Sequence, residues 1–164
     1  MIKSLWNNAL YQKEAIYIHS LQQCELLKNL SSGQIYYLLK NLHKRTYQAE
    51  ENIFQQDSSG NAAYIILEGN VKVHYKEAKA ESNLTNTDIS ILPAGSFFGE
   101  TNLYQKTGTR VVSATSIKKT ILLSLFKADI EQMTSCKPKI AMQLLLNFNE
   151  ILSTRIMQIT QTHL

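Results

Sequence analysis

The middle of the chain constrains the fold most, because short apolar runs alternate there with turn-forming residues. Clusters of Asp, Ser, Gly, Asn or Pro stand at 57–61, 68–70 and 93–95. The intervening runs, such as 64–67 and 120–126, are rich in Ile, Leu and Tyr and short enough to be strands. Many short antiparallel strands at this spacing predict a β-roll or jelly-roll barrel of about eight strands.

Two of these runs show the period-two pattern of half-buried strands. Val71, Val73 and Tyr75 alternate with Lys72 and His74, which predicts one apolar and one polar face. Ile89 and Ile91 alternate in the same way further on. The polar stretch between these runs, residues 76–87, predicts an exposed and mobile hairpin tip.

Toward the two ends of the chain, the apolar residues recur at the spacing of an α-helix instead. Ser31 and Gln34 form a capping-box pattern that predicts a helix from Ser32 to Leu42. Residues 127–133 can form one or two helical turns. Pro138 then suits the first turn of a long helix, along which apolar residues recur every three or four positions as far as Ile159.

The predicted fold is therefore α+β, a double-stranded β-helix (jelly-roll) with N-terminal helices and a long C-terminal helix. We expect a single domain over residues 1–164. It comprises a helical extension at 1–42, the β-roll at 43–126 and C-terminal helices at 127–164.

Composition limits the classes of partner. The net charge of +4 is mild and the Lys and Arg residues are scattered, so we expect no nucleic-acid partner. Cys24 and Cys136 belong to no CxxC pair, which is typical of reduced thiols in a cytoplasmic protein. No apolar run is long enough for a signal peptide or a membrane span, so we expect no membrane partner and a cytoplasmic location.

The sequence contains no motif that is typical of a catalytic site or a metal site. The four histidines show neither HxH nor HExxH spacing. The serine and aspartate residues include no nucleophile elbow or triad. We therefore expect a non-enzymatic protein with no metal site and no cofactor.

The run Phe98-Gly99-Glu100, followed by Arg110, is the strongest candidate site. Arg offers a planar fork that matches phosphate oxygens, and Glu can accept a hydrogen bond from a ribose hydroxyl. Gly99 lets the backbone come close to a ligand. A bracing ion pair between Glu100 and Arg110 is the structural alternative.

The order of these elements resembles the cyclic nucleotide-binding domain, the module of the catabolite activator protein, the protein kinase A regulatory subunit and cyclic-nucleotide-gated channels. The residues that carry the resemblance run from Glu51 and Ile53-Phe54, through Gly60 and the segment 64–73, to 92–100 and Arg110. The resemblance covers most of the chain, from about Leu26 to Arg155.

The resemblance implies a phosphate-binding cassette at 98–114 whose ligand is a cyclic nucleotide, with cyclic AMP favoured over cyclic GMP. By resemblance, Glu100 holds the ribose 2′-hydroxyl and Arg110 the cyclic phosphate. Backbone amides of Gly99, Thr101 and Asn102 add donors, and Val111 occupies the next ligand-binding position. The end of the long helix, at 160–162, is expected to cover the base.

Several cassette residues depart from the family pattern. Thr101 and Asn102 replace an aliphatic residue and Ala, while Val111 stands where a hydroxyl residue is usual and Val112 where Ala is usual. Losing a hydroxyl contact to a charged phosphate costs about 1.5–3 kcal/mol. A degenerate domain that serves as a protein-interaction scaffold is therefore the alternative function.

We expect ligand binding to act through a protein partner or through a rearrangement of a homodimer. The long helix has a wider apolar face than one seam requires, with doublets at 144–145 and 151–152, so we expect a parallel homodimer through residues 137–159. We expect no helix-turn-helix domain after the long helix, and the resemblance is closest to short stand-alone bacterial members. A Crp/Fnr-like transcriptional regulator without its DNA-binding domain is the less favoured alternative.

Overall fold

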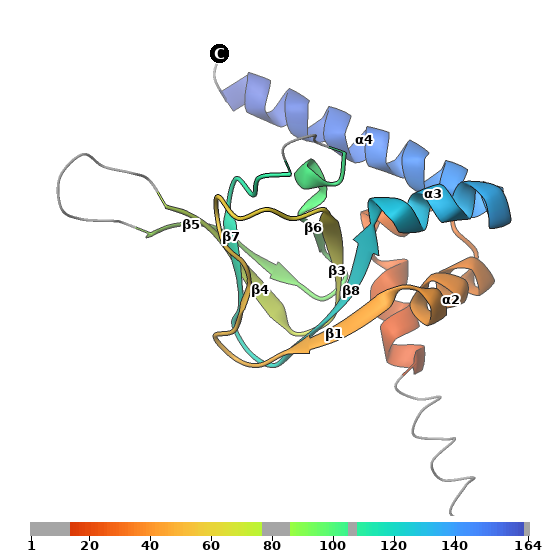
Figure 1. The fold of residues 1–164 in the computed structure, drawn as a ribbon, viewed down its shortest axis with the longest axis horizontal. Helices are drawn as coiled ribbons and strands as arrows, with labels where there is room; N and C mark the ends of the chain where they lie inside the picture. Colours follow the sequence, from red (N-terminus) through yellow and green to blue (C-terminus); the bar gives the residue numbers. More distant parts are fainter. Residues whose placement is uncertain (1–13, 77–85, 105–107, 163–164) are drawn as a thin grey trace, which may run out of the picture.

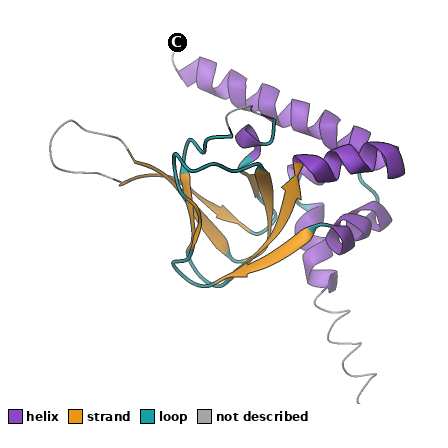
Figure 2. Cartoon of the chain, viewed as in Figure 1, coloured by secondary structure: helices purple, strands orange, loops and turns teal. Residues whose placement is uncertain are grey.

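The computed structural model describes residues 14–76, 86–104 and 108–162. Residues 14–22 are helical, and further helical elements precede and follow eight β-strands (Figures 1 and 2). In chain order the elements are η1 (Glu25–Leu27), α2 (Ser32–Asn41), β1 (His43–Tyr47), β2 (Asn52–Phe54), β3 (Ala62–Glu68), β4 (Asn70–Lys76), β5 (Asn86–Pro93), β6 (Phe97–Phe98), η2 (Glu100–Asn102), β7 (Ser113–Ser116), β8 (Thr120–Phe126), α3 (Lys127–Cys136) and α4 (Pro138–Thr162).

The strands form two four-stranded sheets of antiparallel pairs, in the orders β1-β8-β3-β6 and β2-β7-β4-β5. Apart from the β4–β5 hairpin, successive strands switch between the two sheets, which is the topology of a roll rather than a meander. Figure 2 shows α2, α3 and the start of α4 on one side of the roll, while the rest of α4 runs past the top of the roll. The predicted α+β jelly-roll with N-terminal helices and a long C-terminal helix is confirmed.

The capping box predicted for α2 is present with both of its hydrogen bonds. The backbone N–H of Gln34 donates to Ser31 Oγ over 3.3 Å, and the backbone N–H of Ser31 donates to Gln34 Oε1 over 2.8 Å. These bonds satisfy backbone donors that no intrahelical carbonyl can reach. The helix therefore begins at Ser32, as the sequence predicts.

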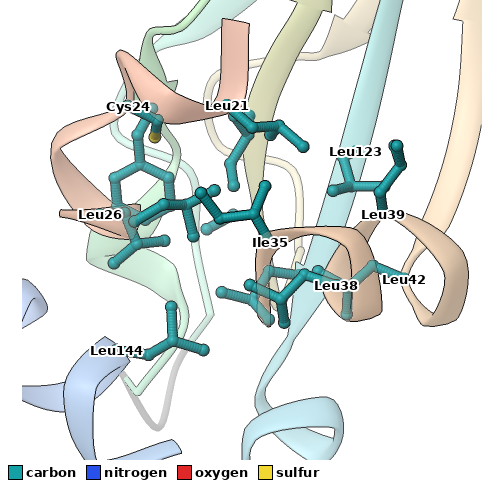
Figure 3. Close-up of a cluster of buried hydrophobic side chains, with 14 of the residues drawn as sticks. Leu21, Cys24, Leu26, Ile35, Leu38, Leu39, Leu42, Leu123 and Leu144 are labelled. Carbon is teal, nitrogen blue, oxygen red and sulfur yellow. The ribbon is translucent and has the colours of Figure 1, made fainter. Parts of the chain in front are cut away.

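The larger hydrophobic core joins the helices to the sheet that contains β3 and β8. In Figure 3, Leu26 of η1 and Leu144 of α4 lie on one side of the cluster, while Leu39 of α2 lies beside Leu123 of β8. Each of these side chains is buried. The core consequently holds η1, α2 and the first half of α4 against the roll as one body.

A second cluster fills the inside of the roll, between the two sheets. Its buried members include Tyr47, Ile66 and Phe98, and Phe54 and Tyr64 pack against it while remaining partly exposed. This interior is aromatic as well as aliphatic. It is the environment in which Arg110 lies.

Two strand residues do not face the way their alternation predicts. Tyr75 is exposed rather than inward, because it lies beyond His74, the last β4 residue that pairs with β7, where β4 continues as a hairpin with β5. Ile91 is 63% exposed and pairs with Lys72, so the two residues share the outer face. Most of the predicted hairpin tip, residues 77–85, lies outside the described residues.

Helix α4 presents apolar side chains on two sides. Leu144, Phe148 and Ile151 are buried against the rest of the domain. A second set is exposed to solvent: Met142, Leu145, Leu146, Ile156 and Met157. Among the described residues, α4 thus carries five exposed large apolar side chains on one face.

Candidate functional site

The candidate site is a loop that leaves the roll after β6 and returns before β7. Gly99 has φ of 78° and directs the chain from β6 into the short helix η2, which begins at Glu100. The return passes through Gly108, Thr109 and Arg110, where Asp57 donates its amide to the Arg110 carbonyl over 2.8 Å. Residues 105–107 lie outside the described residues.

Arg110 points into the roll and is 2% exposed. One terminal guanidinium nitrogen donates to the Gly99 carbonyl over 3.1 Å, and the other donates to the Ala62 carbonyl over 2.8 Å. The side chain therefore links the two ends of the loop to strand β3. Its direction is set by backbone carbonyls.

Aromatic rings surround the guanidinium. Its carbon lies 4.1 Å from the centre of the Phe54 ring and 5.6 Å from the centre of the Tyr64 ring. Phe98 stacks on Tyr64 with ring centres 5.4 Å apart. Cation–π attraction replaces part of the hydration that the buried cation has lost.

Arg110 nevertheless lacks a full electrostatic complement. Among the described residues no carboxylate pairs with it, and its Nε has no hydrogen-bond partner. Burial lowers the pKa of Arg110, and the nearby Tyr64 hydroxyl opposes that shift. A buried cation without a counter-charge is costly, so the arrangement is suited to receive an anion.

Two glycines provide the space in which the guanidinium lies. A Cβ on Gly60 would stand 2.6 Å from Arg110 Nε, and one on Gly99 would stand 3.0 Å from a terminal nitrogen. Both distances are shorter than ordinary packing allows. The glycines at these two positions are therefore part of the construction of the site.

Glu100, at the other end of the loop, is 5% exposed and forms an ion pair with Arg155 of α4. Arg155 also donates to the Phe97 carbonyl over 3.4 Å. Burial lowers the pKa of Arg155, and the charge of Glu25 raises it. Within the described residues, Glu100 and Arg110 thus have separate partners, and the bracing ion pair considered between them is absent.

The remaining predicted residues either form contacts within the domain or are exposed to solvent. Asn102 is buried and donates to the Thr109 carbonyl, so it joins the two arms of the loop next to Arg110. Thr101 is exposed and donates to Asn102 Oδ1 over 3.2 Å. The Val111 side chain is 55% exposed, whereas Val112 packs against the cluster inside the roll.

The predicted cover of the base at 160–162 stays a prediction; the exposed Thr160 donates its hydroxyl to the Ile156 carbonyl over 2.9 Å, within α4. The Phe148 ring of α4 packs edge-on against Tyr104 of the loop, with ring centres 6.0 Å apart. Arg155 is the α4 residue that forms an ion pair with the loop. It was not predicted as a site residue, although it is the one Arg in the stretch 138–162. That isolation on an otherwise almost uncharged helix was an available signal.

The aromatic surroundings of Arg110 were also missed as site residues. Phe54, Tyr64 and Phe98 lie on three different strands, and each one alone reads as an ordinary core residue. Among the described residues there is no group of His, Cys, Asp and Glu able to hold a metal ion. Nor does any helix in the described part of the chain combine the length and apolarity needed to cross a membrane.

Known protein families and curated proteins include matches to the roll and its flanking elements. Residues 44–135 match the model of the cyclic nucleotide-binding domain. The Cyclic AMP receptor protein of Thermus thermophilus is 27% identical over 116 residues, covering 71% of this chain and 51% of that protein. The CRP-like cAMP-activated global transcriptional regulator of Mycobacterium tuberculosis is 25% identical over 125 residues, covering 76% of this chain and 54% of that protein.

Solved structures share the fold. The Thermus thermophilus catabolite activator protein superimposes with a TM-score of 0.73 at 24% identity, over 84% of this chain and 61% of that one. The N-terminal domain of a transcriptional regulator from Streptomyces coelicolor A3(2) gives 0.72 at 21% identity, over 83% and 94%. The chain spans about half the length of the curated relatives it matches.

Because the matched segment takes in more than half of the chain, from β1 through α3, the protein belongs to the cyclic nucleotide-binding domain family. The relatives are named as a receptor and a regulator, not as enzymes.

Proposed function

We propose that this domain is a non-enzymatic sensor that binds a cyclic nucleotide through Arg110 and transmits binding through α4. The observation that carries the proposal is the buried Arg110 guanidinium, which has no carboxylate partner among the described residues and an unpartnered Nε. A cyclic phosphate supplies the missing negative charge and accepts from a planar donor fork.

Glu100 is the proposed acceptor for the ribose 2′-hydroxyl. This carboxylate forms an ion pair with Arg155. A hydroxyl that approaches Glu100 must share the carboxylate with Arg155 or displace it. Either outcome alters the ion pair that joins Glu100 of the loop to Arg155 of α4, so ligand binding is coupled to the position of the helix.

Cyclic AMP is the proposed ligand in preference to cyclic GMP. The support comes from the relatives, two of which are named for cyclic AMP. Asn102 and Val111 do not argue against ligand binding by their positions, because Asn102 bonds within the loop and the Val111 side chain faces away from the roll.

The output is proposed to be a homodimer rearrangement or a change in a protein partner. The exposed apolar residues of α4 supply a surface for a second copy of the helix. Light scattering should show a dimer that Leu146→Glu dissociates. Ile91→Glu makes the same change at an exposed apolar residue of β5 and should leave the dimer intact. A monomer at high protein concentration would reject this part of the proposal.

A degenerate domain acting as an interaction scaffold is the second candidate. It is favoured by the ring of Phe54, which covers one face of the guanidinium, and by Val112, which packs into the roll interior. A thermal-shift series with cyclic AMP, cyclic GMP and cyclic dinucleotides separates the two functions. At a hundredfold excess over Kd a working site should raise the Tm by roughly 5 °C or more. An unchanged Tm with every nucleotide would favour the scaffold.

A further inference from the structure

A pocket lies where the first turn of α2 meets the junction between α3 and α4. It is at the opposite end of α4 from Arg155, on the side of Figure 1 where the three helices come together. Its volume is about 480 Å³. This falls within the range of roughly 300–1,000 Å³ that is usual for small-molecule sites.

The lining of the pocket combines apolar and cationic groups. The Tyr37 ring, Pro138 and the buried Ile140 supply apolar surface, and Lys137 and Lys139 supply positive charge. The Lys137 ammonium lies 5.3 Å from the centre of the Tyr37 ring, so charge and apolar surface are adjacent. None of the described residues that line the pocket is acidic.

Gly33 keeps one wall of the pocket open. A Cβ at this position would meet no atom within 4 Å. Gly in a helix costs about 1 kcal/mol relative to Ala, and here no close packing requires it. A larger side chain at position 33 would extend into open space, which makes the position suitable for filling the pocket by substitution.

We propose that this pocket binds a small amphipathic organic anion. Its apolar body would rest on Tyr37, Pro138 and Ile140, and its carboxylate or phosphate would pair with Lys137 and Lys139. Such a ligand touches both α2 and the start of α4, so it joins two elements that meet at this end of the helix. The inference is independent of the cyclic nucleotide proposed at Arg110.

Cys136 supplies a readout inside the pocket. Its thiol lines the pocket and is exposed, whereas Cys24 is buried and burial raises its pKa to about 12. In the native protein, N-ethylmaleimide should therefore react at Cys136 and spare Cys24. Decanoate serves as the anionic probe and decanol as its uncharged counterpart. Saturating decanoate should slow alkylation of Cys136 by roughly tenfold, and decanol at the same concentration should not.

Substitutions in the pocket lining test whether decanoate protects Cys136 by binding in the pocket. Gly33→Phe should abolish protection by decanoate, while Gly33→Ala, the matched control, should retain most of it. The double change Lys137→Gln and Lys139→Gln should weaken decanoate binding roughly tenfold. Circular dichroism and urea unfolding verify that each variant is folded. The proposal is overturned if decanoate does not protect Cys136, if decanol protects equally, or if protection survives in folded Gly33→Phe. Because the probe is decanoate and the reporter is Cys136, these outcomes do not depend on whether any nucleotide binds.

Discussion

The two arginines that contact the loop differ in how they are held. Arg110 lies inside the roll, 2% exposed, and is bonded to backbone carbonyls and stacked on Phe54. The Arg155 side chain is 42% exposed and is paired with the Glu100 carboxylate at the edge of the loop. The first arginine is built into the scaffold, and the second connects the scaffold to a helix. The difference indicates that Arg110 serves ligand affinity and Arg155 serves coupling.

The largest expected effect is on affinity. Arg110→Ala removes the proposed counter-charge of the phosphate, and two charge-assisted hydrogen bonds are worth about 3 kcal/mol or more together, so cyclic AMP binding should weaken by at least about a hundredfold. Arg155→Ala should weaken binding by less than about tenfold, because the phosphate contact is retained. Isothermal titration calorimetry measures both. Equal losses in the two variants would remove the distinction, and an unchanged affinity in Arg110→Ala would reject the assigned site.

The next largest effect is expected when the Arg110 guanidinium is moved from its position. The Cβ introduced by Gly60→Ala would stand 2.6 Å from Arg110 Nε and 2.8 Å from a terminal nitrogen. The buried side chain must shift, at a cost of about 1–3 kcal/mol, and affinity should fall by roughly tenfold or more.

Gly33→Ala is the matched control for Gly60→Ala, because a Cβ at position 33 meets nothing within 4 Å. It should preserve affinity and raise the free energy of unfolding by up to about 1 kcal/mol. Calorimetry and urea unfolding provide the two measurements. A Gly60→Ala protein with normal affinity would show that the position of Arg110 is not critical.

A smaller effect is expected on stability at the other arginine. Arg155→Ala leaves the buried Glu100 carboxylate without its partner, which should lower the free energy of unfolding by about 1–2 kcal/mol after allowance for the exposure of Arg155. Hydrogen exchange in the second half of α4 should also increase.

The surface pair between Arg45 and Glu51, 3.2 Å apart, provides the comparison for Arg155. Arg45→Ala should change the free energy of unfolding by no more than about 0.5 kcal/mol, since exposed pairs contribute little. If Arg155→Ala is as mild as Arg45→Ala and leaves exchange in α4 unchanged, Arg155 is an ordinary surface residue.

The smallest effect concerns the link within the loop. Asn102→Ala removes the donor to the Thr109 carbonyl and should cost about 1 kcal/mol of stability, with a reduction in affinity of only a few fold. Thr101→Ala, at the exposed neighbour, should have less effect on both quantities. A loss of affinity as large as that of Arg110→Ala would instead make Asn102 a direct ligand contact.

Elements with strong local signals were predictable. Ser31 and Gln34 fixed the start of α2, because both halves of a capping box lie within one turn. The strand predicted at 120–126 is β8 in full, where every residue but the last is buried. The exposure of Tyr75 was not predictable, because it depends on where the pairing of β4 with β7 ends.

The site was predictable in part. Glu100 and Arg110 stood out as charged residues around a glycine-bearing loop, and Gly99 does have the positive φ that its position requires. The partners of these charges were not predictable. Ala62, Phe54 and Arg155 come from β3, β2 and α4, and nothing in their local sequence links them to the loop.

The sequence by itself therefore determined the class of fold and the two charged ends of the loop. Periodicity, caps and turns depend on residues a few positions apart, so the chain carries that information locally. Tertiary structure alone decided that Arg110 is buried without a carboxylate and that Glu100 pairs with α4. Burial and pairing depend on which distant segments meet, and that is fixed only when the whole roll and its helices pack together.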